Sequence, residues 1–238
     1  RFSVGASEMS LTADGPAGPK SNYVMSVRRS YLQFLFDALG LPFLPTFTDY
    51  QFKWKTRFDN RNELKIISIG ALDQFALNKG IVNPTEEQEY ILSYLPTNEQ
   101  WNYTIGAVYT HFTKHGYQTW VLSRNMLNNV AYKYPENDES LSKTFDYKSQ
   151  EIENRFRFEN DYIRGTFRLN VSLNGEYVKY NNRTYQEIFL GGSLQSIDYQ
   201  SDLNFFRYGI SGQASKRFFS EKLSLSFGLR ADANTYSK

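Results

Sequence analysis

The most regular feature of the sequence is an alternation of apolar and polar side chains with a period of two residues. Successive side chains of a β-strand point to opposite faces, so this period predicts strands with one apolar and one polar face. Residues 51–58 show it clearly, with Phe52, Trp54 and Phe58 alternating with Lys53, Lys55 and Arg57. The alternation returns at 101–110, 151–159, 167–177, 206–214 and 223–230. The charged positions need water on their side of the sheet.

The length of these runs favours strands that cross a membrane. The mean strand of a globular protein has about 5 to 6 residues, whereas a tilted membrane strand needs about 9 to 11. Most of the runs reach the longer value, and Trp101 and Tyr109 lie at the two ends of one apolar face. Membrane barrels place such rings at both lipid–water interfaces. We therefore predict an all-β fold, an antiparallel up-and-down transmembrane β-barrel of the outer-membrane type.

The connections between the predicted strands alternate between short and long. Short ones are expected at 15–20, 59–62, 114–116, 160–162 and 219–222, and long ones at 33–47, 74–100, 126–147 and 180–199. Outer-membrane barrels alternate in this way, with short turns in the periplasm and long loops outside the cell. The strands number ten from Leu11 onward, or eleven if the change of apolar parity around Ser7 and Glu8 marks a tight turn, which we favour over a bulge.

Two of the long loops contain patterns that predict short helices. Residues Tyr31–Leu39 are apolar on all sides and are followed by the helix-stop residues Gly40 and Pro42. Residues Thr85–Leu95 begin with a capping-box spacing between Thr85 and Gln88. We expect both helices to lie over the mouth of the barrel.

Composition narrows the classes of protein further. Aromatic residues make up 17% of the 238 residues, and yet the mean hydropathy is −0.56, a combination that fits a sheet with one wet face. No run approaches the roughly 18 apolar residues of a spanning helix. There is no Cys, which excludes disulfides and thiolate sites. The net charge of +2 comes from interleaved residues and gives no reason to expect nucleic acid as a partner.

The N-terminal region resembles a known family. It contains Leu11-Thr12-Ala13-Asp14-Gly15-Pro16, a short turn through Lys20, and a strand from Tyr23 that closes in Arg28-Arg29-Ser30-Tyr31. This stretch resembles the start of the barrel in TonB-dependent outer-membrane transporters, most of all the Bacteroidetes forms. The resemblance implies a 22-stranded barrel filled by an N-terminal plug domain and energised through TonB. Residues 1–238 would then be a partial barrel domain, with the plug and the remaining strands outside this chain.

Basic residues on the polar strand faces are the first candidate site. Lys53, Lys55 and Arg57 form a stripe that could contact a plug or an anionic substrate. Three further residues could extend that stripe across neighbouring strands: Arg155, Arg157 and Arg168. The alternative is a solvated lumen wall whose charges pair with Glu151, Glu153 and Glu159.

Aromatic residues in and after the second long loop are the other candidate. Tyr90, Tyr94 and Trp101 could stack on a ring of a sugar or siderophore, or they could be ordinary interface aromatics.

Residue types that carry catalysis or bind metals are sparse. His111 and His115 have no clustered carboxylate and make a poor metal site, so we interpret them as polar residues near the rim. Glu151 and Glu153 lie on a charged strand face without the surroundings of an acid–base pair. We expect no catalytic residues, no metal site and no cofactor.

The function that these observations favour is TonB-dependent import of a scarce nutrient, such as a siderophore, cobalamin, a glycan or a peptide. The expected partners are outer-membrane lipid, the protein's own plug domain, the TonB complex and a surface lipoprotein. Two alternatives remain. One is a small passive barrel or barrel scaffold, and the other is a soluble carbohydrate-binding β protein that needs no detergent.

Overall fold

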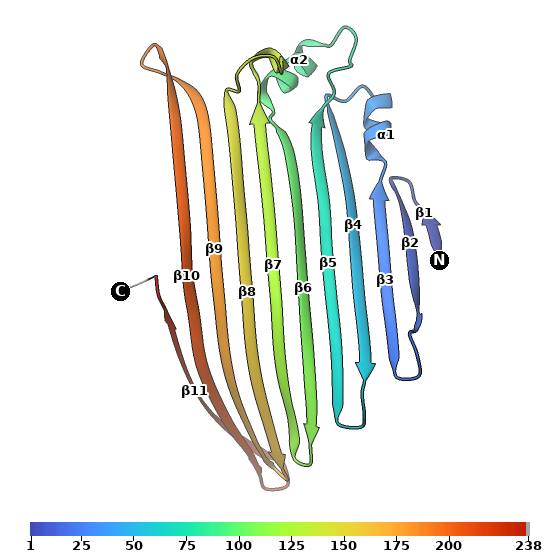
Figure 1. Ribbon diagram of the computed structural model, residues 1–238, viewed down its shortest axis with the longest axis vertical. Coiled ribbons are helices and arrows are strands. Elements are labelled where there is room, and N and C mark those ends of the chain that lie inside the picture. The colour runs from blue at the N-terminus through green and yellow to red at the C-terminus, as the bar shows by residue number, and fades with distance from the viewer. Residues whose placement is uncertain (237–238) are drawn as a thin grey trace.

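The computed structural model describes residues 1–236, which form one antiparallel sheet of 11 strands (Figure 1). Neighbours in the sheet are also neighbours in the sequence, so the topology is up-and-down throughout. The strands are β1 (Phe2–Val4), β2 (Glu8–Pro16), β3 (Ser21–Ser30), β4 (Phe43–Arg57), β5 (Asn62–Leu77), β6 (Thr97–Thr113), β7 (Gly116–Lys133), β8 (Phe145–Arg164), β9 (Phe167–Leu190), β10 (Ser193–Phe218) and β11 (Leu223–Asn234). The predicted fold class is confirmed.

The long loops and the helices gather at one end of the sheet, together with the β1–β2 and β9–β10 turns, and the other short turns lie at the opposite end, the short-turn end (Figure 1). The helices are α1 (Leu32–Ala38), α2 (Glu86–Tyr94) and the 3₁₀ turn η1 (Pro135–Asn137). The capping box is present, because the Thr85 hydroxyl accepts from the Gln88 N–H and the Gln88 side chain accepts from the Thr85 N–H. Both predicted loop helices are therefore confirmed.

The N-terminal segment folds back on itself, as the change of parity predicted. Phe2 lies opposite Leu11 and Val4 lies opposite Met9, so β1 and β2 form a hairpin. Tyr31 closes it, because its backbone N–H donates to the Ser7 carbonyl. The turn is confirmed, and the strand count is eleven.

One predicted short turn is wrong. Residues 160–162 lie inside β8, and the chain turns at Gly165 and Thr166 instead. Gly165 has φ of +57°, a conformation that glycine adopts without strain. The polar residues that suggested a turn are strand residues: Asp161 lies on the polar face and bonds Arg168, and Asn160 lies opposite Gln118 on the other face.

The predicted long loop at 180–199 is also wrong. Strand β9 continues to Leu190 and β10 begins at Ser193, so a two-residue turn of Gly191 and Gly192 joins them. Where a hairpin extends beyond the lipid, both of its faces meet water. The alternation of apolar and polar residues then disappears from the sequence, although the backbone hydrogen bonds between the strands continue. The other three long loops are shorter than predicted for the same reason, since their strands extend past the apolar band.

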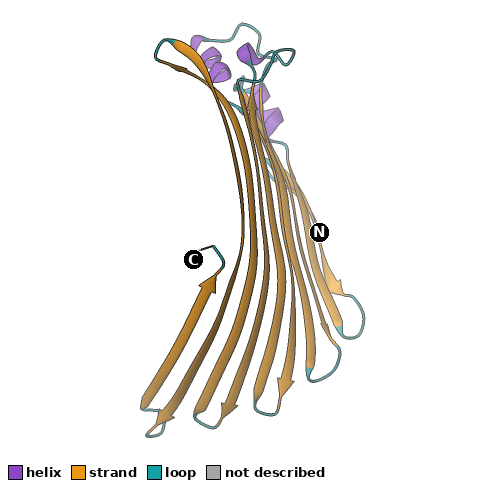
Figure 2. Ribbon diagram, turned by 60° about the vertical axis from the view of Figure 1, so that its left-hand side comes forward, coloured by secondary structure: helices purple, strands orange, loops and turns teal. Residues whose placement is uncertain are grey.

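The sheet has two chemically different faces and is curved (Figure 2). Register places Tyr23, Trp54 and Ile66 side by side on one face, followed by Ala107 and Leu122. Large apolar side chains on this face are exposed, including Ile105, Leu122 and Phe227 at 44%, 61% and 67%. Among the described residues, Leu77 and Ala131 are the buried apolar ones. The apolar face therefore has no protein layer over it within residues 1–236.

None of the helices within residues 1–236 is long and apolar enough to span a membrane.

Candidate functional site: the polar face at the short-turn end

Basic side chains converge on one carboxylate near the short turns. Antiparallel register puts Arg57 of β4 opposite Glu63 of β5, and Lys55 opposite Lys65. The Glu63 carboxylate lies 2.9 Å from the Lys55 Nζ, 3.2 Å from an Arg57 nitrogen and 3.0 Å from the Lys65 Nζ. The Glu63 side chain is only 5% exposed, while the three cations keep 33% to 58% of their surface. One carboxylate facing several cations leaves this corner electropositive.

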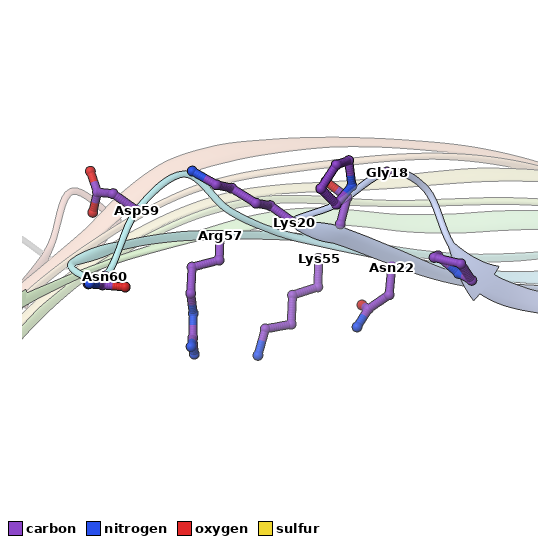
Figure 3. Close-up of a pocket in the computed structure, with 10 residues that line it drawn as sticks. Gly18, Lys20, Asn22, Lys55, Arg57, Asp59 and Asn60 are labelled. Atoms are coloured by element: carbon purple, nitrogen blue, oxygen red, sulfur yellow. The ribbon is translucent and has the colours of Figure 1, made fainter.

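The basic corner borders a hollow of about 620 Å³ between two short turns (Figure 3). Asn22, Lys55 and Arg57 point to the same side of the sheet in Figure 3, and Lys20 and Asp59 come from the two turns. The Lys20 ammonium donates to the Phe58 carbonyl at 2.7 Å and so ties the turns together. The lining residues are Pro16, Gly18, Pro19, Lys20, Ser21, Asn22, Lys55, Arg57, Asp59 and Asn60. The hollow has the size and charge to receive a small anionic group or an acidic segment of a protein.

Asp59 stabilises the β4–β5 turn that forms one wall of the hollow. Its carboxylate accepts from the Asn62 side chain at 2.7 Å and from the Arg61 backbone N–H at 2.7 Å. These bonds favour the charged form and hold the pKa of Asp59 below its usual value. The turn therefore keeps its shape and its negative charge at neutral pH.

The arginines of β8 and β9 form a second, separate cluster on the same face. Arg155 bonds Glu153 and Glu176, both at 2.8 Å. Arg157 lies 3.3 Å from Glu159. Arg168 lies 2.7 Å from the buried carboxylate of Asp161, which also accepts from the Asn170 amide. Each arginine of this cluster is thus neutralised by a carboxylate of the wall.

The two clusters do not form one continuous stripe. Strands β5, β6 and β7 separate β4 from β8, and the β6 residues between them on this face include Thr104, Gly106 and Val108. The expected extension of the basic stripe across neighbouring strands is therefore wrong. The paired-wall interpretation describes the β8–β9 cluster, whereas Lys55 and Arg57 border an electropositive hollow. Lys53 lies on the same face of β4 but does not line the hollow.

The carboxylates that organise both clusters were missed from the sequence. The acidic partners in these ion pairs include Glu63, Asp161 and Glu176. The positions of the basic residues in the sequence do not show which carboxylates they bind. Glu63 carried a usable signal, because a hairpin closed by Asp59–Asn62 brings it opposite Arg57. Glu176 did not, since its partnership with Arg155 depends on where the β8–β9 turn falls.

Two of the three candidate aromatic residues lie together, and the third lies apart from them. The rings of Tyr90 and Tyr94 on α2 stack at 5.9 Å with 7° between their planes, and both side chains are about two-thirds exposed. Trp101 instead lies on the apolar face of β6, where its ring stacks 6.2 Å from that of Tyr103. The structure therefore brings Tyr90 and Tyr94 together but places Trp101 at the lipid-type girdle.

Hydrogen bonds join the long loops into one assembly at the far end of the sheet. The Gln88 amide donates to the Gly40 carbonyl at 2.7 Å, and the Asn137 amide donates to the Leu92 carbonyl at 3.0 Å. Lys79 donates to the Asn137 carbonyl and pairs with Glu139. The 31–42 and 134–144 loops thus support the helix that presents the tyrosine pair.

The histidines make polar contacts near the short turns. His111 Nδ1 lies 2.7 Å from the Asn62 side-chain oxygen, and the His115 ring packs 5.9 Å from Tyr162. Within residues 1–236, no group of three His, Cys, Asp or Glu side chains could hold a metal ion.

Comparison with solved structures places this geometry in a known fold. FpvA of P. aeruginosa bound to heterologous pyoverdines matches 95% of this chain at 10% identity, with a TM-score of 0.63. The ferric enterobactin receptor PfeA of Pseudomonas aeruginosa, as a G324V mutant, matches 96% at 13% identity and a TM-score of 0.60. The outer membrane transporter YddB of Escherichia coli matches 96% at 8% identity and a TM-score of 0.54. The chain spans 35%, 36% and 34% of these structures.

No family model matches the chain. No curated protein matches it either. The fold is that of the barrel in these outer-membrane proteins, and the chain spans about a third of each of them. The predicted fold class is confirmed, whereas the partial barrel domain with a plug and further strands outside this chain stays a prediction.

Proposed function

We propose that the chain is part of the barrel of an outer-membrane transporter that imports a scarce nutrient. The observation that carries the proposal is the two-faced sheet: within residues 1–236 its apolar face has no protein layer over it, and its other face carries charges and the basic hollow. A sheet with these faces crosses lipid as a closed barrel, with its polar face lining the interior. The chain would therefore reside in the bacterial outer membrane.

The interior of that barrel would hold a plug domain. The hollow bordered by Lys20, Lys55 and Arg57 lies at the short-turn end, which faces the periplasm in this fold. An acidic element of the plug would complement its charge, and release of that contact under force from TonB would open a path along the wall. The resemblance of the Leu11–Tyr31 stretch to TonB-dependent transporters supports this energy source.

The substrate would be captured by the long loops. Their hydrogen bonds hold α2 at the mouth, where the exposed Tyr90–Tyr94 pair presents flat apolar surface to a ring. The FpvA structure contains pyoverdines, and PfeA is a ferric enterobactin receptor. A siderophore is therefore one candidate substrate, beside cobalamin, a glycan or a peptide. A surface lipoprotein that hands over substrate would contact the same loops.

The experiment is uptake by cells that carry or lack the full-length protein, with growth limited in turn by iron, cobalamin, a glycan or a peptide. We expect one of these nutrients to enter only when the protein is present, and uptake to stop when the proton-motive force is collapsed. A passive barrel would continue to admit solute without that force, which would contradict the energised mechanism. Recovery of the full-length protein from the soluble fraction would contradict the membrane assignment.

A further inference from the structure

One arginine lies on the wrong face for the pattern of this sheet. Register places Arg124 of β7 between Ile105 of β6 and Asn154 of β8, and both neighbours belong to the apolar face. Trp120, four residues nearer the short turns, packs in the aromatic cluster with Tyr109 and Phe158. A strand rises about 3.3 Å per residue, so Arg124 lies on the order of 13 Å from Trp120, towards the loop side of the apolar face, where Tyr103 and Trp101 lie.

The guanidinium of Arg124 is held in place by neutral groups. Its Nε donates to the Tyr103 hydroxyl at 3.0 Å, and Nη1 donates to the Asn154 side-chain oxygen at 3.1 Å. A third nitrogen lies 4.0 Å from the Met126 sulfur. Tyr103 and Met126 face each other one pair further from the short turns, so the side chain extends towards the loop end.

The charge of Arg124 has no carboxylate partner among residues 1–236, where its contacts are the three neutral groups just named. The arginines of the polar face differ, because Arg155, Arg157 and Arg168 each bond an acidic side chain. A positive charge on a lipid-facing strand position is destabilising unless an anion accompanies it. An anionic group from outside residues 1–236 would balance this charge.

An apolar hollow lies directly beside the guanidinium. It has a volume of about 390 Å³, and Ile66, Ile105, Ala107 and Leu122 supply its apolar walls, with Arg124 and Asn154 at the end nearer the loops. Ala107 is small and leaves space between the larger side chains of Ile66 and Leu122, its partners in the ladder. A cation next to an apolar groove matches an amphiphile that carries an anionic group at one end.

We propose that Arg124, Tyr103 and Asn154 form a binding site for the phosphate group of a membrane lipid, with a lipid chain lying in the hollow of Ile66, Ala107 and Leu122. A guanidinium has five N–H donors, and those not directed at Tyr103, Asn154 and Met126 can bind phosphate oxygens in a charge-assisted manner. The guanidinium lies level with the Tyr103 hydroxyl, and tyrosine hydroxyls mark the headgroup boundary of a membrane. The lipid would therefore come from the leaflet on the loop side.

This inference rests on the membrane orientation given under the proposed function and adds a specific site to it. The test uses the full-length protein extracted in detergent, exposed to phosphatidylglycerol, phosphatidylcholine or bisphosphorylated lipid A, and examined by native mass spectrometry. We expect the wild-type protein to retain the phosphate-bearing anionic lipids at least ten-fold more than phosphatidylcholine. Retention of lipid A alone would assign the site to the phosphorylated glycolipid, and retention of both would assign it to lipid phosphate in general.

Three variants separate the site from a general affinity for lipid. Arg124→Gln keeps two hydrogen-bonding groups but removes the charge, and is expected to lower retention of the anionic lipid about ten-fold. Arg124→Lys is expected to be intermediate, since an ammonium lacks the planar fork. Arg207→Gln is the matched control, because it removes one arginine from the polar face, where Arg207 lies 3.4 Å from Glu176. It should retain lipid like the wild type.

A fourth variant keeps the charge and fills the groove. The Phe side chain of Ala107→Phe would occupy the hollow and should also lower retention of the anionic lipid. This variant tests the site even if Arg124→Gln fails to assemble in the membrane. Equal retention by wild type, Arg124→Gln and Ala107→Phe would overturn the proposal. So would disulfide-linked dimers of Leu122→Cys in membranes, which would show that a second copy covers this face. A wild-type protein that is membrane-integrated but retains no anionic lipid would refute this site and leave the proposed function standing.

Discussion

The ring of Tyr50 lies against the backbone of Gly70, its direct partner across the β4–β5 ladder. A Cβ built on Gly70 would come within 2.5 Å of the ring and 2.9 Å of the Asn102 carbonyl oxygen. The hydroxyl of Tyr50 continues past the glycine and bonds the Ser68 hydroxyl at 2.9 Å. The glycine thus provides the space in which a large aromatic side chain lies flat on the sheet, a device that stabilises curved sheets.

Replacing Gly70 with Ala should displace Tyr50 and break its bond to Ser68. Over-packing of this kind costs about 1 to 3 kcal/mol. Gly175→Ala is the matched control, because Gly175 lies on the same face and a Cβ there would meet nothing within 4 Å. The measurement is the urea midpoint of the full-length protein in lipid vesicles. Equal midpoints for the two variants would show that the Tyr50 ring adapts freely.

A second glycine is required by the backbone itself. Gly116 begins β7 with φ of +141°, and a Cβ there would collide with the carbonyl oxygen of Asp161 on β8. We expect Gly116→Ala to be more destabilising than Gly70→Ala, because a backbone carbonyl in a ladder cannot move aside as a ring can. Gly165→Ala tests φ alone, since Gly165 has φ of +57° with open space around it and should cost only about 1 kcal/mol. A smaller loss of stability in Gly116→Ala than in Gly165→Ala would contradict the predicted collision with the Asp161 carbonyl.

The buried carboxylate of Glu63 should hold the basic corner together. Glu63→Gln leaves Lys55, Arg57 and Lys65 facing one another without an anion, so their repulsion should lower stability by about 1 to 3 kcal/mol. Added salt should recover part of that loss, because the cations are partly exposed and are screened. The measurement is the unfolding midpoint at low and high ionic strength. Glu221→Gln, which breaks an exposed pair with Arg217, should change little at either. A salt-independent loss in Glu63→Gln would point to packing instead of charge.

The loop assembly depends on single side-chain bonds between loops. Asn137→Ala removes the bond to the Leu92 carbonyl and should loosen α2 from η1, because the remaining link there is Lys79. The expected result is faster cleavage within residues 78–96 by a protease added to intact cells. Ser142→Ala, an exposed residue of the same loop, is the control and should be cleaved at the wild-type rate. Unchanged cleavage of Asn137→Ala would show that the loops hold their positions independently.

The sequence predicted the parts of the fold that follow from local patterns, above all from the two-residue alternation of apolar and polar side chains. It identified the two faces, the N-terminal turn and the helix begun by Thr85, because each depends on residues close together in the chain. It failed at 180–199, where both faces of the hairpin are wet and the period no longer has a chemical signal. The partners of the candidate residues also escaped it. Glu176 bonds Arg155 and Arg207 through register across three strands, and register follows from turns that alternation alone does not locate.

The tyrosine pair on α2 should govern capture of the transported nutrient, whatever its identity. Aromatic pairs contribute about 0.5 to 1.5 kcal/mol beyond the area that they bury, so Tyr90→Ala with Tyr94→Ala should raise the concentration for half-maximal uptake by about 3- to 10-fold while leaving the maximal rate nearly unchanged. Tyr90→Phe with Tyr94→Phe keeps the stacked rings and should behave like the wild type if stacking, and not the hydroxyls, makes the contact. Trp101→Ala should leave half-saturation unaltered, because its ring lies beside Tyr103 on the apolar face, away from the tyrosine pair. Uptake is measured in cells with labelled nutrient over a range of concentrations. A shift produced by Trp101→Ala but not by the tyrosine variants would move the capture surface from the loop helix to the girdle.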